Sequence, residues 1–448
     1  MNEALKEYYR SRTITAEEAA KMVQSGDVIG TALGPPAASA AFMDAVFDRW
    51  QELENVQFYD AVQMPPHRLW NLDFARQAYG HINYVPGFIG GPIRKVGEAK
   101  LADYVPQVGW IAPHTGVNRF SVFVRQVTPP NSNGYINLSL DNFYTTRLLK
   151  EGRTKGKLRL CIAEINENLP VVYGDTWVHI SDFDYFVQNN TPIPEYALRP
   201  EPNSIEKTIG GYVSEMIKDG DCVQMGIGGI TEAILQNLDG KRHLGIHTEM
   251  IPPSLLDLVN RGIVDNSQKV NHRGITTATF CAGDKALYEY ARENPALGLY
   301  PGDVGNVPTY IGQNPNTVAL NQALQIDLTG QISVESYGHR QISGSGGQPD
   351  FQMGAQWSPG GRAITVLPSA RKTKDGQLVS NIVPEFEPGT IVSVPRWMAD
   401  YIVTEYGVAN LKYKSISERS QALIEIAHPD LRGELRAAAR KNFSPNLG

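Results

Sequence analysis

Glu249 is one of the positions in this 448-residue chain whose residue type and sequence context could support chemistry. It ends the apolar run 244–249 and stands within His247-Thr248-Glu249-Met250, just before two prolines and a helical pattern at 254–262. We expect the run to be a buried strand, which puts Glu249 at a strand's carboxyl end, where open α/β sheets bind ligands. A carboxylate there is accessible to a substrate yet partly desolvated, which makes it more reactive. A helix-start charge or a salt bridge is an equally good local interpretation, and His247 is interpreted as a supporting or core histidine.

Two glycine-rich segments have the composition of anion-binding loops. Residues 226–230 read GIGGI between an expected strand and an expected helix, so their backbone N–H groups and the helix start favour an anionic ligand. The segment does not match the dinucleotide fingerprint, because Thr231 stands where glycine is required. Residues 343–351 read SGSGGQPDF and offer a second close approach of backbone to ligand. A tight turn and a flexible linker, respectively, remain the alternatives.

Other catalytic classes lack their residues. There is no HExxH and no GxSxG, and the three cysteines are far apart without a CxxC pair, so we predict no metal site and no disulfide framework. A net charge of −6 without basic clusters argues against nucleic-acid binding. No long apolar segment indicates a membrane helix or a signal peptide. We therefore expect a cytoplasmic, soluble protein.

The elements that must position these residues alternate between apolar strands and amphipathic helices. Expected strands include 27–33, 109–114, 122–128, 159–166, 221–228 and 390–395; expected helices include 204–220, 231–238 and 415–427. Such alternation is typical of parallel βαβ units. The segments 22–35 and 216–229 resemble each other, as do 134–137 and 330–333, at nearly the same offset. We predict two tandem, similar open α/β domains with mainly parallel sheets, at 1–195 and 196–448, joined within the proline-rich segment 189–204.

Five segments in order resemble the class I CoA-transferases, in particular the branch of 4-hydroxybutyrate and butyryl-CoA:acetate CoA-transferases within the acetyl-CoA hydrolase/transferase family. They are GIGGI at 226–230, HTEM at 247–250, SGSGGQPDF at 343–351, DTWVHISDFDYFV at 175–187, and VTEYGVANLKYKSISERSQALIEIAHPDLR at 403–432. The resemblance covers nearly the whole chain. One departure lies at 407–413, where the family more often shows an aspartate and then Arg-Gly.

The resemblance implies an enzyme with its active site at the interface of the two domains. Glu249 is then similar to the catalytic nucleophile, which forms a glutamyl-CoA thioester in a ping-pong reaction, with glycine N–H groups as oxyanion donors. No permanent cofactor is implied, since acyl-CoA and a short-chain carboxylate are substrates, and a homodimer is expected. The implied CoA contacts are Gly226, Ile227, Gly228, Gly229, Ile230, Leu324 and Gly347, with Lys372 a further candidate for a CoA phosphate or carbonyl.

Three other functions remain open at this point. A short-chain acyl-CoA hydrolase would share the fold and the glutamate but use water as acceptor, and sequence hardly separates the two. A non-catalytic acyl-CoA-binding protein would not need Glu249 together with both glycine segments. A nicotinamide dehydrogenase is disfavoured by Thr231. For the acyl group, we hypothesise that Leu33 and Ala37, in the N-terminal counterpart of the glycine segment, form part of its binding surface.

Overall fold

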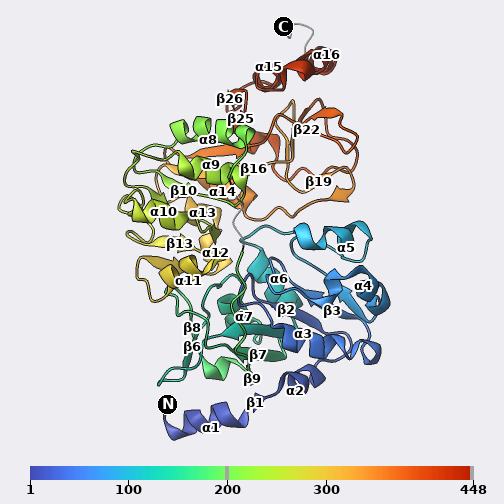
Figure 1. Cartoon of the computed structure of the whole chain (residues 1–448), viewed down its shortest axis with the longest axis vertical. Helices are drawn as coiled ribbons and strands as arrows, with labels where there is room; N and C mark the ends of the chain where they lie inside the picture. Colours follow the sequence, from blue (N-terminus) through green and yellow to red (C-terminus); the bar gives the residue numbers. More distant parts are fainter. Residues whose placement is uncertain (197–200, 444–448) are drawn as a thin grey trace. The chain divides into compact units, whose positions relative to one another are not determined.

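The computed structural model describes residues 1–196 and 201–443, which group into two compact units (Figure 1). The described part of unit 1 comprises residues 1–196, 249–253 and 275–306, and that of unit 2 comprises residues 201–248, 254–274 and 307–443. Residues 197–200 of the predicted linker lie outside the described residues. The domain limits 1–195 and 196–448 stay a prediction. Glu249 belongs to unit 1.

Unit 1 is built on a seven-stranded sheet in which every neighbouring pair is parallel. From edge to edge its strands are β1 (Thr13–Ile14), β9 (Tyr185–Gln188), β7 (Leu160–Ile165), β5 (Val122–Val127), β2 (Val28–Thr31), β3 (Val56–Tyr59) and β4 (Ile82–Tyr84). The two central strands β5 and β7 are buried at every position. Such continuous burial is expected of parallel strands covered on both faces.

Helices cover both faces of this sheet (Figure 1). On β5, Val122 and Val124 pack on one side, and Phe123 and Val127 pack on the other, as the period of two requires. The first side is covered by α2 (Ala16–Lys21), α3 (Ala40–Phe47) and α4 (Leu72–Ala78). The second is covered by α6 (Ala112–Arg119) and α7 (Thr145–Glu151). Two separate apolar cores therefore hold the sheet.

The later segments of unit 1 attach to a loop region after β5. They contain β12 (Met250–Ile251) beside β14 (Phe280–Cys281), β13 (Thr276–Ala278) beside β15 (Leu297–Leu299), α11 (Lys285–Ala291) and α12 (Gly302–Gly305). Backbone hydrogen bonds from Asn142 to Thr279 (2.9 Å) and from Cys281 to Leu140 (2.8 Å) fix the attachment. Glu249 thereby shares one compact unit with the seven-stranded sheet.

Unit 2 contains a six-stranded sheet that is parallel except for its last strand. Its order is β11 (Gly245–Ile246), β10 (Cys222–Gln224), β16 (Thr317–Gln322), β21 (Arg362–Val366), β25 (Tyr401–Thr404) and the antiparallel β26 (Gly407–Asn410). Its helices include α8 (Ser204–Met216), α9 (Gly229–Gln236), α10 (Leu255–Asn260), α14 (Gln348–Trp357), α15 (Ile416–Glu425) and α16 (Arg432–Asn442). No described helix of the chain is long and apolar enough to cross a membrane.

The sequence repeat has a matching structural repeat. Gly26 and Gly220 both adopt left-handed backbone conformations (φ 83° and 79°), and the aspartate after each accepts a hydrogen bond from the backbone N–H three residues before it. Asp27 then pairs with Arg159 just before β7, and Asp221 pairs with Arg362 at the start of β21. The prediction of two similar α/β units with mainly parallel sheets is confirmed.

Three predicted elements differ from the structure. Residues 109–114 were expected as a strand, but α6 begins within them, because Pro113 fits the first turn of a helix. Residues 390–395 form only an isolated bridge, Val394 to Ile332. The strand expected at 244–249 is shortened to Gly245–Ile246, because backbone pairing with β10 ends at the hydrogen bond from His247 N–H to the Val223 carbonyl (3.2 Å).

Candidate active site

The backbone of Glu249 is fixed by the neighbouring strand of unit 1. Its carbonyl oxygen accepts hydrogen bonds from the N–H of Thr279 (2.9 Å), the hydroxyl of Thr279 (2.8 Å) and the N–H of Phe280 (3.2 Å). Met250 and Ile251 then pair in parallel with Phe280 and Cys281. Three hydrogen bonds on one carbonyl leave the peptide little freedom, so the side chain starts from a defined position.

Asn306 holds the side chain of Glu249. Its Nδ2 donates to Oε2 of Glu249 at 2.5 Å, and Asn306 itself is fully buried at the end of α12. Burial raises the pKa of Glu249 from 4.5 to about 7, and the hydrogen bond from Asn306 opposes that rise. A carboxylate with such a pKa is half ionised near neutral pH and more basic than an exposed glutamate.

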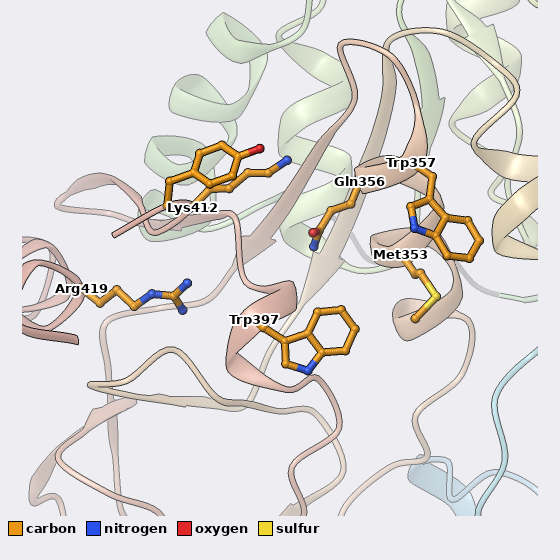
Figure 2. Close-up of a pocket in the computed structure, with 7 residues that line it drawn as sticks. Met353, Gln356, Trp357, Trp397, Lys412 and Arg419 are labelled. Atoms are coloured by element: carbon orange, nitrogen blue, oxygen red, sulfur yellow. The ribbon is translucent and has the colours of Figure 1, made fainter. Parts of the chain in front are cut away.

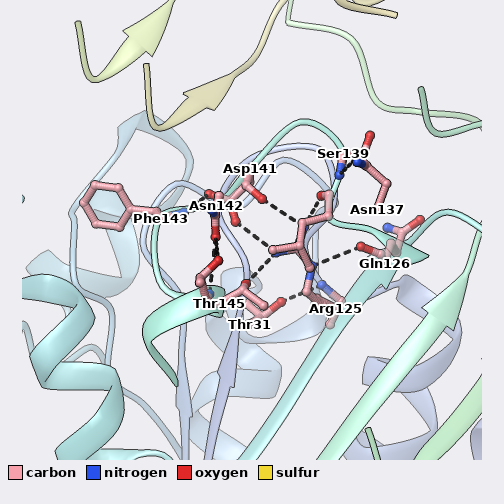
Figure 3. Close-up of polar contacts among 12 residues, drawn as sticks. Thr31, Arg125, Gln126, Asn137, Ser139, Asp141, Asn142, Phe143 and Thr145 are labelled. Carbon is pink, nitrogen blue, oxygen red and sulfur yellow. Dashed lines mark hydrogen bonds and ion pairs between the residues drawn. The ribbon is translucent and has the colours of Figure 1, made fainter. Parts of the chain in front are cut away.

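A buried arginine supports the strand that holds Glu249 (Figure 3). Arg125 lies on β5 with no exposed surface and donates to the carbonyls of Leu138 and Asp141, both in the loop that contacts Thr279 and Cys281. Its other N–H groups reach the Thr145 hydroxyl (2.5 Å), the Asp141 carboxylate (3.5 Å) and the carbonyl of its neighbour Gln126 (3.2 Å). All five guanidinium donors are therefore used.

Asp141 completes this support. Burial raises the pKa of Asp141 to about 6, while Arg125 and the backbone N–H groups of Phe143 and Leu33 act to lower it. Its carboxylate thus connects the loop 138–142 to Leu33, which follows β2. A continuous path of hydrogen bonds runs from β5 through this loop and Thr279 to the carbonyl of Glu249.

Leu33 and Ala37 both lie in the interior of unit 1, with 2% and 0% of their surface exposed. Leu33 belongs to the same apolar cluster as Phe280 and Ala282, and Met250 packs against that cluster. At Gly34 (φ 61°), an added Cβ would lie 3.7 Å from the Phe280 ring. The loop after β2 therefore packs on the strand that holds Glu249.

The glycine segment 226–230 lies in unit 2, directly after β10. Gly228 (φ 115°) is the residue before α9, and no side chain caps this helix. The position needs glycine because few other residues adopt such a φ. The backbone N–H groups of residues 227–230 have no hydrogen-bond acceptor among the described residues. Ile227 is 43% exposed, whereas Ile230 is buried.

The other predicted CoA contacts collect at the same edge of the six-stranded sheet. Leu324 follows the end of β16, and Lys372, on β22 (Ala370–Lys372), follows β21 and is exposed. Gly347 caps α14, the helix that connects β16 to β21 and packs on both strands. Since β10, β16 and β21 are parallel neighbours, these residues and the glycine segment share the carboxyl edge of unit 2.

His247 is a core residue of unit 2. It is 1% exposed, its Nδ1 lies 3.2 Å from the side-chain amide of Asn314, and its ring packs edge-on against Tyr310 and Phe351. The described part of the chain holds no group of three or more histidine, cysteine and carboxylate side chains arranged to bind a metal ion, and the three cysteines are buried and unpaired.

Sequence patterns did not indicate Asn306, Thr279 or Arg125. Asn306 lies 57 residues from Glu249 in the chain, and no motif joins the two. Arg125 is the one charged residue in strand β5, which is the one available signal, since a charged residue at a buried position requires buried partners.

Comparisons with known proteins identify the family. The sequence model of the acetyl-CoA hydrolase/transferase N-terminal domain matches residues 1–195, and that of the C-terminal domain matches residues 283–439. The chain belongs to the acetyl-CoA hydrolase/transferase family. It is similar to a succinyl-CoA:cyclohexane-1-carboxylate CoA transferase of Geobacter metallireducens, with 37% identity over 97% of this chain and 96% of that protein.

Two further relatives span the full length. A 4-hydroxybutyrate coenzyme A transferase of Clostridium kluyveri is 36% identical over 98% of this chain and 99% of that protein. The crystal structure of RipA from Yersinia pestis superimposes with a TM-score of 0.86 at 31% identity, covering 99% of this chain and 100% of that one. The predicted family and fold are confirmed, and the chain is an enzyme of the CoA-transferase type.

Proposed function

We propose that the protein transfers CoA from a short-chain acyl-CoA to a carboxylate, with Glu249 as nucleophile. The observation that carries the proposal is the state of this side chain: partly buried, held at 2.5 Å by Asn306, and titrating near neutral pH. Such a carboxylate is ionised in a large fraction of molecules at physiological pH, yet it is less stabilised by water than an exposed one.

In the proposed reaction, a Glu249 oxygen attacks the thioester carbonyl, and the tetrahedral intermediate expels CoA thiolate to leave an acyl-glutamyl anhydride. The thiolate then attacks the glutamyl carbonyl and releases the donor's carboxylate, which leaves a glutamyl-CoA thioester. The acceptor carboxylate reverses both steps. No proton is consumed and no water enters, so the energy of the thioester is retained.

Family relatives named for 4-hydroxybutyrate and for succinyl-CoA with cyclohexane-1-carboxylate favour a carboxylate acceptor. We propose 4-hydroxybutyrate or butyrate, with acetyl-CoA as partner, as the substrates. CoA would contact the carboxyl edge of unit 2 through Gly226–Ile230, Leu324 and Gly347, and Lys372 would meet a phosphate or carbonyl. The backbone N–H groups of residues 227–230 have no acceptor among the described residues, so they are suited to donate hydrogen bonds to CoA.

Acyl-CoA hydrolysis is the second candidate, because the family comprises hydrolases and transferases. Purified protein given butyryl-CoA with and without acetate distinguishes the two. A transferase forms acetyl-CoA only with acetate and releases little free thiol, whereas a hydrolase releases thiol at the same rate without acetate. Glu249→Gln is the control, and acetyl-CoA formation that persists in this variant would exclude Glu249 as the nucleophile.

A further inference from the structure

A cavity of about 410 Å³ opens on unit 2 among aromatic and basic side chains (Figure 2). α14 contributes Gln356 and Trp357, and the short helix at Arg396–Met398 contributes Trp397. Lys412, Tyr413 and Arg419 complete it from the region between β26 and α15. A volume in this range is typical of small-molecule sites.

Arg419 carries a buried positive charge. It is 8% exposed and donates to the carbonyls of Arg396 (2.6 Å), Lys414 (3.1 Å) and Thr329 (3.2 Å). Within residues 1–196 and 201–443, no carboxylate lies at ion-pair distance from it. Arg419 also stands in the first turn of α15, at the positive end of the helix dipole. An uncompensated buried cation is costly, and an anion bound beside it would offset that cost.

Lys412 adds a second positive charge to the cavity. Its Nζ lies 5.5 Å from the centre of the Tyr413 ring, and the described residues place no carboxylate within 4.0 Å of it. Burial raises the pKa of Asp400, and Lys412 is among the groups that act to lower it; the Asp400 carboxylate also accepts the N–H of Ala363 at 3.1 Å. In Figure 2 the guanidinium of Arg419 points toward the space beside Gln356 and Trp397, and the end of Lys412 lies above Gln356 in the view.

The aromatic residues of the cavity are unusually accessible. Trp357 is 54% exposed, Trp397 is 64% exposed and Tyr413 is 94% exposed. Tyr413 also has a left-handed backbone (φ 62°), which costs energy for a bulky residue and presents its ring to solvent. Flat apolar faces next to two cations suit a ligand that joins a planar ring to an anionic group.

This cavity lies at the opposite edge of the sheet from the proposed CoA contacts. Trp357 is at the C-terminal end of α14, whereas Gly347 is at its start. Trp397 precedes β25, and Lys412 follows the antiparallel β26, so both lie at the amino edge of the parallel strands. The six residues of β16 separate the two edges by about 20 Å.

We propose that this cavity is a second ligand site that binds a nucleoside phosphate, with the base on Trp357, Trp397 and Tyr413 and the phosphate between Lys412 and Arg419. A phosphate monoester carries about two negative charges at neutral pH, which matches two cations better than a single carboxylate does. The base–indole contact follows the stacking that holds nucleic-acid bases on aromatic side chains. The ligand is either a free nucleotide or the nucleotide end of a second CoA molecule.

Equilibrium dialysis of the full chain with labelled AMP tests the proposal, with and without excess CoA. AMP should bind at one site per chain, and adenosine, which lacks the phosphate, should bind about tenfold more weakly. Trp397→Ala and Lys412→Ala should each weaken AMP binding about tenfold and leave CoA transfer unchanged. Trp177→Ala, which alters a 37% exposed tryptophan of unit 1, is the matched control.

Excess CoA separates the two sources of the nucleotide. If AMP still binds in the presence of excess CoA, the natural ligand is a free nucleotide. If CoA displaces AMP, the ligand is a second CoA molecule; the wild type should then bind two CoA per chain, and Trp397→Ala should bind one. The proposal is overturned if AMP does not bind, or if both pocket variants bind AMP as the wild type does. If Trp397→Ala instead changes the number of chains per assembly in solution and leaves AMP binding unchanged, this surface is an interface between copies of the chain.

Discussion

Replacing Asn306 by alanine removes the side-chain donor that lies 2.5 Å from Glu249 and opposes the effect of burial on its pKa. A hydrogen bond to a charged group contributes about 1.5 to 3 kcal/mol, and one pH unit corresponds to about 1.4 kcal/mol. The pKa of Glu249 should therefore rise from about 7 by about one to two pH units. Only the ionised form attacks the thioester, so activity at pH 7, where the wild-type residue is about half ionised, should fall about 5- to 50-fold.

The assay is the pH dependence of kcat/KM for butyryl-CoA with acetate. In the wild type, kcat/KM should increase with pH to a plateau, with the midpoint of the increase near pH 7. In Asn306→Ala the midpoint should move to higher pH, and kcat/KM at high pH should come close to the wild-type plateau. Asn294→Ala is a suitable control, because Asn294 also sits at a helix end but donates to the carbonyl of Tyr290. A loss that is equal at every pH, with an unmoved midpoint, would refute the reasoning.

Three further perturbations test the site in other ways. Folding raises the pKa of Glu249 from 4.5 to about 7, so the folded chain holds that proton more tightly than the unfolded chain does. The wild type should therefore lose stability relative to Glu249→Gln as the pH rises from 4.5 to 7. Urea midpoints that change with pH in the same way in both proteins would contradict this. Arg125→Met leaves Asp141 buried without its partner and should lower the free energy of unfolding by about 3 to 5 kcal/mol, with Arg125→Met/Asp141→Asn recovering part of it; a loss below about 1 kcal/mol would show that the pair is not needed. Leu33→Phe and Ala37→Val enlarge two buried side chains of the loop that packs on the strand holding Glu249 and should lower kcat/KM for butyryl-CoA more than for acetyl-CoA; identical ratios across acyl lengths would show that this loop does not shape the acyl site.

The pattern of apolar residues in the sequence was enough to predict the two sheets. β5 and β7 are continuous apolar runs apart from Arg125, Gln126 and Glu164, and runs of this kind are typical of strands covered on both faces. The Gly-Asp pair before β2 occurs again before β10 because both turns need a left-handed glycine and an aspartate that accepts a backbone hydrogen bond. The sequence repeat therefore indicated the structural repeat.

Short elements and long-range partners were not predictable in the same way. The segment 343–351 read as a loop, yet α14 begins at Gln348 because Pro349 fits the first turn and the following residues are helical. Asn306 meets Glu249 only through the folding of α12 onto unit 1, and nothing within either local segment encodes that contact. Glu249 could be chosen as a candidate from its position in the sequence, whereas the asparagine that holds its side chain could not.

Mass spectrometry of the Glu249 peptide tests the catalytic role of this residue most directly. The chain is incubated with butyryl-CoA without an acceptor, digested, and searched for a covalent CoA adduct, with borohydride reduction to trap the thioester. We predict an adduct on Glu249 that disappears when acetate is added, and none in Glu249→Gln. Turnover of butyryl-CoA with acetate but without any adduct on this peptide, or with an adduct on another residue, would contradict the proposed mechanism.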